Sequence, residues 1–383
     1  MGDRFPRART AVAGAATFGV GEAPGYSTME IAANAVKLAL ADAGISLPEV
    51  DGLFIALPDD LFAGLSLAQY LGIHPRFTDN NRAGGASFMS HLVTAVMMLD
   101  AGYLDCAVIA YGANQRSSGG KLSTPARPDR WDAPYAPMYP LSFYALAAAR
   151  HMHQYGTTRE HLAEVAVAAR QWANTNPEAF AKGPLTIEDC LSARLISTPI
   201  SVRDCCLVTD GGAALVLTRT DRARDCRRPA VPVLGAAAAT WYNSITQAED
   251  VTITAAAESG PRAMAMAGLS PTDIDVVQLY DAFTINTILF LEDLGFCAKG
   301  EGGAFVSGGR IAPGGALPVN TNGGGLSCCH PGMYGMFAMV EAVRQMRGEA
   351  ANQIAGARTA LAHGNGGTLS AQATVIFGSP DTV

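Results

Sequence analysis

Apolar positions along the chain alternate between a helical and an extended pattern. Residues 29–43 place Ile31, Ala35 and Leu38 on one face of a helix, and Gly44 supplies the signal that ends it. Short unbroken apolar runs, typical of buried strands, stand between such helical segments. The pattern predicts strands at 10–15, 52–56, 106–111, 276–280, 358–362 and 373–377, and helices at 29–43, 62–71, 87–99, 253–267, 284–294 and 333–346. This alternation predicts an α/β protein with parallel strands and helices on both faces of the sheet.

The middle of the chain interrupts the alternation. Residues 117–209 are rich in Ala, Arg, Tyr and Pro, and they contain helical patterns at 141–155 and 159–174. We interpret them as an insertion that shapes a pocket, within a first lobe of residues 1–230. Residues 231–383 form the second lobe.

Two segments that stand 224 positions apart resemble each other. Residues 43–56, AGISLPEVDGLFIA, align without a gap with residues 267–280, AGLSPTDIDVVQLY. The identical pairs are Ala43/Ala267, Gly44/Gly268, Ser46/Ser270 and Asp51/Asp275. An internal duplication of a βαβ unit explains this match. We therefore expect two similarly folded lobes with a functional site at their junction.

Composition and charge narrow the function. Hydrophobic residues make up 49% and charged residues 16% of the 383 positions, which excludes intrinsic disorder. The net charge is -7 and no basic block occurs, so we expect no nucleic-acid partner. Apolar runs fall short of the roughly 20 residues that a membrane helix needs.

The cysteines and the first residues bear on the compartment. Eight cysteines form no C-x-x-C pair and do not resemble a disulfide framework, which favours a reduced, cytoplasmic setting. The start of the chain, MGDRFPRARTAVAGAATFGVG, superficially resembles a signal peptide. Its apolar part is broken by glycines and lacks leucines, so we interpret it as a first strand.

Five motifs carry a resemblance to a known family. They are DGGAA at 210–214, YDAF at 280–283, LEDLGFCAKGEG at 291–302, NTNGGG at 320–325 and CHP at 329–331. Together they are similar to the thiolase superfamily, and the third is similar to its lipid-transfer or sterol-carrier-protein branch. The resemblance implies two duplicated α/β lobes in an α-β-α-β-α layered core, capped by the insertion.

The chain departs from this family at the nucleophile. Classical thiolases carry an acyl-accepting cysteine at the start of a buried helix, whereas the aligned position here is Gly84 or Gly85. No cysteine occurs between Met1 and Leu104, so the usual thioester cannot form on that helix. The second family cysteine is also absent, and Ala362-His363-Gly364 stands in its place.

The resemblance implies that His330 donates to an oxyanion or moves a proton, with Asn320 and Gly324 in the substrate-binding loop. We place His330 in a glycine-rich loop that opens a helix, where the helix dipole favours negative charge. A packing histidine at a turn is the alternative. Gly84 and Gly85 would let a thioester carbonyl approach the backbone closely.

Four further side chains are candidates. Ser87 is the nucleophile-type group nearest to the missing cysteine, but we expect it to be a helix N-cap, because no adjacent base is evident in the sequence. In thiolase-like retro-aldolases of steroid side-chain breakdown, a tyrosine in a Y-D-x-F element acts as acid or base, so Tyr280 is a candidate against the alternative of a core residue. His363, placed after a strand, could exchange a proton with the substrate. Cys329 lies beside a possible cation that would lower its pKa, but we expect it to be a packing residue.

These observations predict an enzyme that acts on a CoA thioester. The first hypothesis is an acyltransferase of the non-classical thiolase type, acting on 3-oxoacyl-CoA substrates. The second is a retro-aldolase that cleaves a β-hydroxyacyl-CoA, and the third is a non-catalytic acyl-CoA or lipid-binding protein. We expect no tightly bound cofactor besides the coenzyme A of the substrate, and no metal, since the histidines lack ligand spacing.

The resemblance also implies partners. We expect a homodimer that pairs through the strand at 106–111, an apolar strand that would otherwise be a hazardous exposed edge. Many proteins of this branch also need a small partner with an OB-fold and a zinc ribbon.

Overall fold

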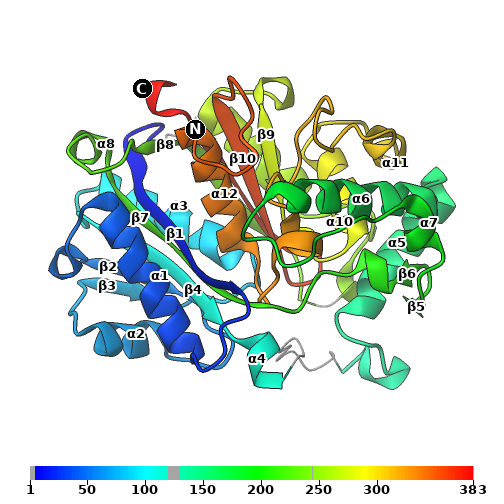
Figure 1. Cartoon of the computed structure of the whole chain (residues 1–383), viewed down its shortest axis with the longest axis horizontal. Coiled ribbons are helices and arrows are strands. Elements are labelled where there is room, and N and C mark those ends of the chain that lie inside the picture. Colours follow the sequence, from blue (N-terminus) through cyan, green and yellow to red (C-terminus); the bar gives the residue numbers. More distant parts are fainter. Residues whose placement is uncertain (1–4, 120–129, 244, 383) are drawn as a thin grey trace.

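A single mixed sheet runs through the molecule and carries both halves of the chain. The computed structural model in Figure 1 describes residues 5–119, 130–243 and 245–382, so residues 120–129 of the expected insertion lie outside it. The strand order is β3-β2-β4-β7-β1-β8-β11-β10-β9. These strands are β1 (Thr10–Gly21), β2 (Gly52–Ile55), β3 (Phe77–Asp79), β4 (Ala107–Ala113), β7 (Asp210–Arg219), β8 (Val231–Thr240), β9 (Val276–Leu279), β10 (Thr359–Gly366) and β11 (Ala371–Gly378).

The principal helices follow the predicted positions. They are α1 (Thr28–Ala43), α2 (Ala63–Leu71), α3 (Ser87–Asp100), α5 (Leu141–Tyr155), α6 (Arg159–Thr175), α9 (Ala256–Ala267), α10 (Thr284–Asp293) and α12 (Gly335–Arg347). No helix in the described ranges is long and apolar enough to span a membrane.

The two halves of the sheet have the same topology. On one side β1 pairs antiparallel with β7, β7 antiparallel with β4, and β4 parallel with β2. On the other side β8, β11, β10 and β9 repeat these orientations in the same sequence. A parallel bridge from Val277 to Val319 even matches the pairing of β2 with β3. The halves join where β1 pairs with β8.

The repeated sequence segments occupy equivalent places in these halves. Residues 43–56 end α1 and form β2, and residues 267–280 end α9 and form β9. Asp51 accepts hydrogen bonds from the backbone of Asp105 and Cys106 before β4, and Asp275 does the same for Arg358 and Thr359 before β10. The predicted duplication is therefore confirmed, down to the role of one repeated pair of carboxylates.

The layers are those expected. Helix α1 packs on β1, β4 and β7, while α9 packs on β8 and β11. Between them, α3 and α12 contact strands of both halves (Figure 1). Nearly every residue of α12 is buried, as a helix enclosed on all sides requires. The two halves of the sheet thus form the two β-layers of the expected α-β-α-β-α arrangement, with α3 and α12 between them. The lobe boundary at residues 230 and 231 stays a prediction.

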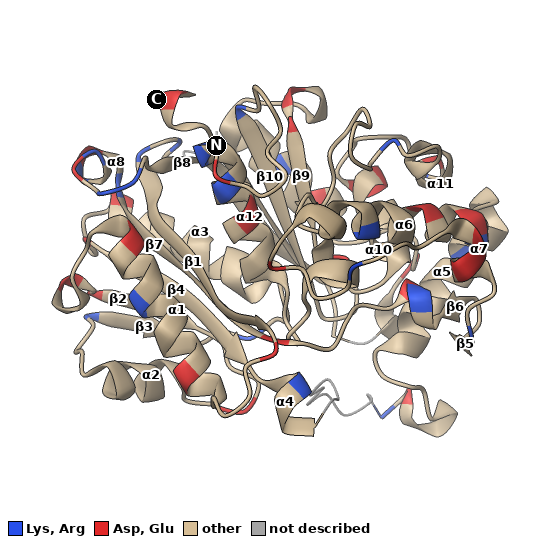
Figure 2. Ribbon diagram, in the orientation of Figure 1, with Lys and Arg blue, Asp and Glu red and all other residues tan. Residues whose placement is uncertain are grey.

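The insertion lies against the second half of the chain. Helix α5 contacts α10, and α6 contacts α10 and the turn at 324–328 (Figure 1). Charged side chains avoid the sheet: on its strands they are confined to Asp79, Asp210 and Arg219 (Figure 2). The buried charged groups, such as Asp281, Glu292 and Glu341, therefore lie mainly outside the strands of the sheet, on helices and loops.

Three expectations about elements are wrong. The strand predicted at 358–362 continues to Gly366, because β10 pairs with β11 along its whole length and the sequence GNGG only resembles a loop. The glycine run at 323–325, expected to be a loop, enters a π-helical turn, Gly324–Cys328, whereas α12 begins at Gly335, two residues from its predicted start. The strand expected to be an exposed edge, β4, lies buried between β2 and β7.

We expect the duplicated carboxylates to stabilise both halves. Asp51→Ala and Asp275→Ala should each lower the free energy of unfolding by about 1–2 kcal/mol, because each leaves two backbone N–H groups without their acceptor. Urea unfolding would measure this, with the exposed Asp225→Ala as the control. Equal stability of all three variants would contradict the structural role.

Candidate active site

Tyr280 and His330 form a buried pair between the two halves of the sheet. Tyr280 follows β9, and His330 lies between the π-helical turn and α12. The phenol oxygen is 3.0 Å from Nε2 of His330, and the two rings meet edge to face. The exposed fraction is 5% for Tyr280 and 3% for His330. The structure thus brings together two residues that the sequence separates by fifty positions.

Burial determines the protonation of the pair. It lowers the pKa of His330 to about 4 and raises the pKa of Tyr280 well above its usual value. At neutral pH the proton therefore stays on the phenol, whose acceptors are Nε2 of the neutral imidazole at 3.0 Å and the carbonyl oxygen of Gly332 at 3.3 Å. The other ring nitrogen, Nδ1, has no hydrogen-bond partner in the described part of the chain. Such a pair can pass a proton through the phenol to the imidazole without forming a free tyrosinate.

Asp281, which the sequence analysis did not select, holds the histidine loop in place. Its Oδ1 accepts a hydrogen bond of 2.6 Å from the amide of Gly325, and Oδ2 one of 3.4 Å from Leu326. Burial raises the pKa of this carboxyl to about 7. Two features of the sequence could have identified Asp281. It directly follows the tyrosine at the end of a predicted strand, and the chain contains a glycine run whose backbone amides need an acceptor.

The residues predicted to bind substrate in this loop have internal partners. Oδ1 of Asn320 accepts a hydrogen bond from the amide of Leu279, and a Cβ on Gly324 would lie 2.1 Å from Oδ2 of Asp281. This geometry favours a structural role for Asn320 and Gly324 in shaping the loop around Asp281. The helix dipole predicted at His330 is absent there, because α12 starts five residues later.

The glycines that replace the thiolase cysteine face the ring of Tyr280. A Cβ on Gly85 would lie 1.8 Å from Cε2 of Tyr280, which is an impossible contact. Gly84 has a φ of +68° and approaches the backbone of Gly366 so closely that a Cβ would lie 2.8 Å from its Cα. The space in which a side chain at position 85 would begin is therefore filled by Tyr280.

Ser87 is occupied by its own loop. Its hydroxyl donates to the carbonyl of Gly84 and accepts from the amide of Ala83, each at 2.7 Å. The N-cap of α3 is Ala86, so the expectation of a capping serine is wrong. These bonds hold the glycine turn closed and favour a structural role over a nucleophilic one.

His363 lies inside β10 rather than after it. Its Nε2 is 2.6 Å from Oε1 of Gln372 and its Nδ1 is 2.9 Å from the hydroxyl of Thr374, both on β11. Its ring packs against Phe290 of α10, whereas the neighbouring Gly364 faces α3. The structure thus places His363 on the opposite face of the sheet from α3, and its direct role in proton exchange is not favoured.

Cys329 does not have the environment of a reactive thiol. Burial raises its pKa well above the usual value, contrary to the lowering expected from a neighbouring cation. The described cysteines are all free. Packing, the role expected for Cys329, fits this environment.

We expect the buried carboxyl of Asp281 to make stability depend on pH. Its pKa is raised from 3.8 to about 7 by folding, so its contribution is full below pH 3.8 and is lost as the pH rises towards 7. Asp281→Asn should therefore gain stability relative to wild type between pH 4.5 and 7.5, by at most about 1.4 kcal/mol per pH unit. Urea unfolding at both pH values, with Asp225→Asn as the control, measures the difference. Parallel pH dependence of the three proteins would refute it.

Comparison with known proteins identifies relatives along most of the chain. Residues 237–379 match the family described as "Thiolase C-terminal domain-like". A steroid side-chain-cleaving aldolase of Thermomonospora curvata is 34% identical over 90% of this chain and 91% of its own length. A 17-hydroxy-3-oxo-4-pregnene-20-carboxyl-CoA lyase of Mycobacterium tuberculosis and an acetyl-CoA acetyltransferase of Methanothermobacter thermautotrophicus are each 35% identical over 88% of this chain and 91% of theirs.

Solved structures of similar proteins also match most of this chain. The structure described as "Ltp2-ChsH2(DUF35) aldolase" superimposes with a TM-score of 0.89 and 32% identity, covering 98% of this chain and 99% of that one. A monomeric SCP2-thiolase-like protein of Mycobacterium smegmatis gives a TM-score of 0.79 at 21% identity, covering 97% and 78%, and shows the same fold.

Proposed function

Because the chain belongs to the SCP2-thiolase-like branch of the thiolase superfamily, we propose that it is a lyase that cleaves a β-hydroxyacyl-CoA by a retro-aldol reaction. One observation carries the proposal: the ring of Tyr280 fills the space beside Gly85, where a thiolase would carry its nucleophile. A retro-aldol reaction needs no acyl-enzyme, but it needs a group that removes the proton of the β-hydroxyl. The Tyr280–His330 pair supplies such a group.

The chemistry of the pair follows from its protonation. The β-hydroxyl of the substrate gives its proton to the phenol oxygen of Tyr280 as the phenol proton moves to Nε2 of His330. The β-carbon then forms a ketone or aldehyde, and the electrons of the Cα–Cβ bond move onto the thioester as an enolate. The imidazolium returns its proton through Tyr280 to Cα, which releases the shortened acyl-CoA. The concerted transfer avoids a free tyrosinate, which burial makes costly.

The relatives support this reaction class. Two of those aligned over about nine-tenths of the chain are an aldolase that cleaves steroid side chains and a lyase of a steroid carboxyl-CoA. Acyl transfer is the second candidate, because a relative of equal identity is an acetyl-CoA acetyltransferase. A non-catalytic acyl-CoA or lipid-binding protein is the third, and the polar pair held in a buried site argues against it.

We extend the proposal to partners and location. A small DUF35-type protein is proposed as a partner because a structure of high similarity is an aldolase with such a component. A homodimer is proposed through β3, an edge strand of the sheet, beside the exposed apolar side chains of Leu61, Phe62 and Leu65. Coenzyme A is expected as part of the substrate, and the cytoplasm as the location.

The reaction class can be tested by product analysis. We expect the protein to convert a β-hydroxyacyl-CoA with a tertiary β-carbon into a ketone and a shorter acyl-CoA without added free CoA. Tyr280→Phe should lower kcat by about 100- to 10,000-fold, since proton transfer contributes this much. Chromatography of the CoA products and mass spectrometry of the intact protein measure both.

Two outcomes of that experiment separate the alternatives. An absolute requirement for free CoA, or an acyl adduct on Ser87 or Cys329, would establish acyl transfer in place of lyase chemistry. Binding of acyl-CoA without any turnover would favour the non-catalytic protein.

The contact between Gly85 and Tyr280 gives an independent prediction. Gly85→Ala should lower kcat by about 100-fold, because the methyl group displaces the phenol from His330 and a displacement of about 1 Å has this effect. The matched control is Gly119→Ala, whose added methyl group would meet nothing within 4 Å among the described residues. Unchanged turnover in a folded Gly85→Ala protein would refute the role of this contact.

A further inference from the structure

A chain of hydrogen bonds runs through the second half of the sheet and ends at a second buried phenol. Nε2 of His363 faces Oε1 of Gln372 at 2.6 Å, and Nε2 of Gln372 donates to Oδ1 of Asn365 at 3.3 Å. Nδ2 of Asn365 then donates to the hydroxyl oxygen of Tyr144 at 2.8 Å. Residue 144 comes from the insertion, and the other three come from β10 and β11.

All the hydrogen bonds of this series run in the same donor-to-acceptor direction, from His363 towards Tyr144. Oε1 of Gln372 accepts, so Nε2 of His363 carries the proton, and Nδ1 of His363 is the acceptor for the hydroxyl of Thr374. The side-chain amides of Gln372 and Asn365 keep this direction, since each donates a hydrogen bond from its nitrogen to the oxygen of the next residue in the series. The hydroxyl of Tyr144 thus accepts from Asn365, and the phenol proton is the group that it has left to donate. Asn286 of α10 is a second side chain within hydrogen-bonding reach of this hydroxyl. Hydrogen bonds aligned in this way strengthen one another.

Tyr144 lies beside the Tyr280–His330 pair. Its ring packs on Phe283, three residues after Tyr280, with 4.5 Å between the ring centroids. Asn286 of α10 donates to the backbone carbonyl of Tyr280. Burial is the main cause that raises the pKa of Tyr144 and Tyr280, and Cys206 lies close enough to raise both further. The uncharged phenols of Tyr144 and Tyr280 therefore both lie at the buried site that contains His330.

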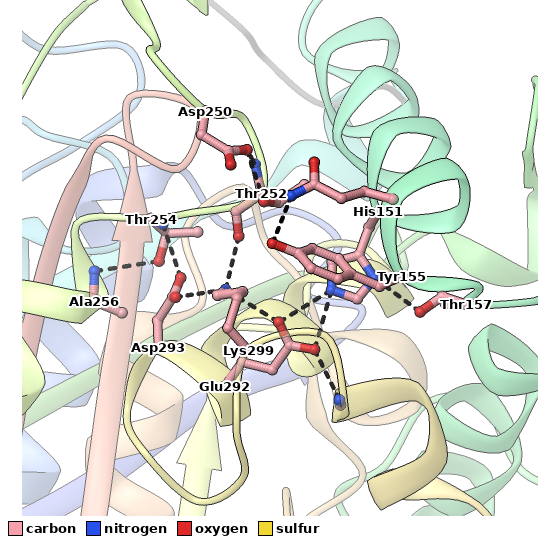
Figure 3. A network of polar contacts seen from close by, with 12 residues as sticks. His151, Tyr155, Thr157, Asp250, Thr252, Thr254, Ala256, Glu292, Asp293 and Lys299 are labelled. Carbon is pink, nitrogen blue, oxygen red and sulfur yellow. Dashed lines mark hydrogen bonds and ion pairs between the residues drawn. The ribbon is translucent and has the colours of Figure 1, made fainter.

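The helix that carries Tyr144 is anchored at its other end. Figure 3 shows His151, two turns further along α5, bonded to Glu292 of α10 at 3.0 Å and to Thr157 at 2.8 Å. Glu292 also accepts from Lys299 and from the amide of Gly302. A buried network thus fixes α5 to α10, the helix that follows Tyr280 and Phe283 in the chain. A donor held on rigid elements is what stabilisation of a developing charge requires.

We propose that Tyr144 is a third catalytic residue, whose hydroxyl donates a hydrogen bond to the thioester oxygen of the CoA substrate as the enolate forms. Asn365, Gln372 and His363 are positioning residues that keep this hydroxyl oriented as a donor. The proposal rests on the proposed retro-aldol function. That reaction needs one group that moves a proton and another that stabilises the enolate, and Tyr144 is assigned the second role. Tyr280 and His330 move the proton, and Tyr144 stabilises the charge on oxygen; the hydrogen bond transfers no proton.

Two substitutions test the proposal with little change of shape. Tyr144→Phe keeps the ring on Phe283 and removes the hydroxyl. Asn365→Asp keeps the shape of the side chain but replaces the amide donor by a carboxyl oxygen. This oxygen would accept a hydrogen bond from the phenol of Tyr144, so that the hydroxyl could no longer donate to the substrate. Tyr155→Phe is the matched control, since it removes from the same helix a phenol hydroxyl that accepts a hydrogen bond from Gln154.

The measurements are turnover of a β-hydroxyacyl-CoA and binding of two probes by calorimetry. The probes are acetyl-CoA and a carboxymethyl-dethia analogue of CoA, whose carboxylate imitates the enolate. Tyr144→Phe should lower kcat by about 100- to 1,000-fold and weaken binding of the analogue by about 10- to 100-fold. Binding of acetyl-CoA should stay within about threefold, because a neutral carbonyl gains much less from the hydrogen bond. Asn365→Asp should change the same quantities in the same direction, and Tyr155→Phe should not.

The outcomes separate this inference from the proposed function. Wild-type turnover together with unchanged kcat and analogue binding in folded Tyr144→Phe would overturn the role of Tyr144 alone. Equal weakening of both probes would also overturn it, since that result indicates lost packing. A wild-type protein that neither cleaves the substrate nor binds the probes would refute the proposed function, and the role of Tyr144 with it.

Discussion

The contact between the ring of Tyr280 and the backbone of Gly85 is the constraint on which the rest of the site depends. The phenol reaches His330 only because position 85 has no side chain, and the glycine turn lies against β10 only because Gly364 and Gly366 leave it room. Gly335 at the start of α12 completes this packing, since a Cβ there would lie 2.0 Å from the carbonyl oxygen of Gly85. Glycines from three parts of the chain thus pack together around one turn, and Gly85 of that turn meets the ring of Tyr280. The absence of a nucleophile and the presence of the tyrosine are therefore one structural fact.

Burial converts this packing into chemistry. Desolvation holds His330 neutral, keeps Tyr280 protonated and raises the pKa of Asp281 to about 7. At neutral pH the imidazole of His330 and the phenol of Tyr280 are therefore uncharged, and the carboxyl of Asp281 is partly protonated. A site of this kind favours a transition state in which charge moves by concerted proton transfer. It also agrees with a reaction in which carbon–carbon cleavage puts charge on the substrate.

The insertion contributes to the site rather than merely covering it. Helix α5 places Tyr144 on Phe283 near one end and His151 on Glu292 near the other, so that α5 and α10 behave as one unit. The duplicated halves supply the frame, in which Asp51 and Asp275 hold equivalent backbone turns. The residues of the proposed mechanism thus lie where the symmetry of the frame is broken, at the inserted segment and at the loop around His330.

The sequence by itself determined the α/β class, the duplication and the identity of the central pair. Helical and extended periods are local properties, and the repeated motif with Asp51 and Asp275 was visible without any contact. It also marked Tyr280, His330, Gly84 and Gly85 as exceptional. Only the tertiary structure decided which of these meet, because partners such as Tyr144 and Asn365 are 221 positions apart and join through strand register and helix packing. The same register moved His363 into a strand and gave Ser87, Asn320 and Gly324 internal partners. Residue type shows what a side chain can do, whereas burial and neighbours decide what it does.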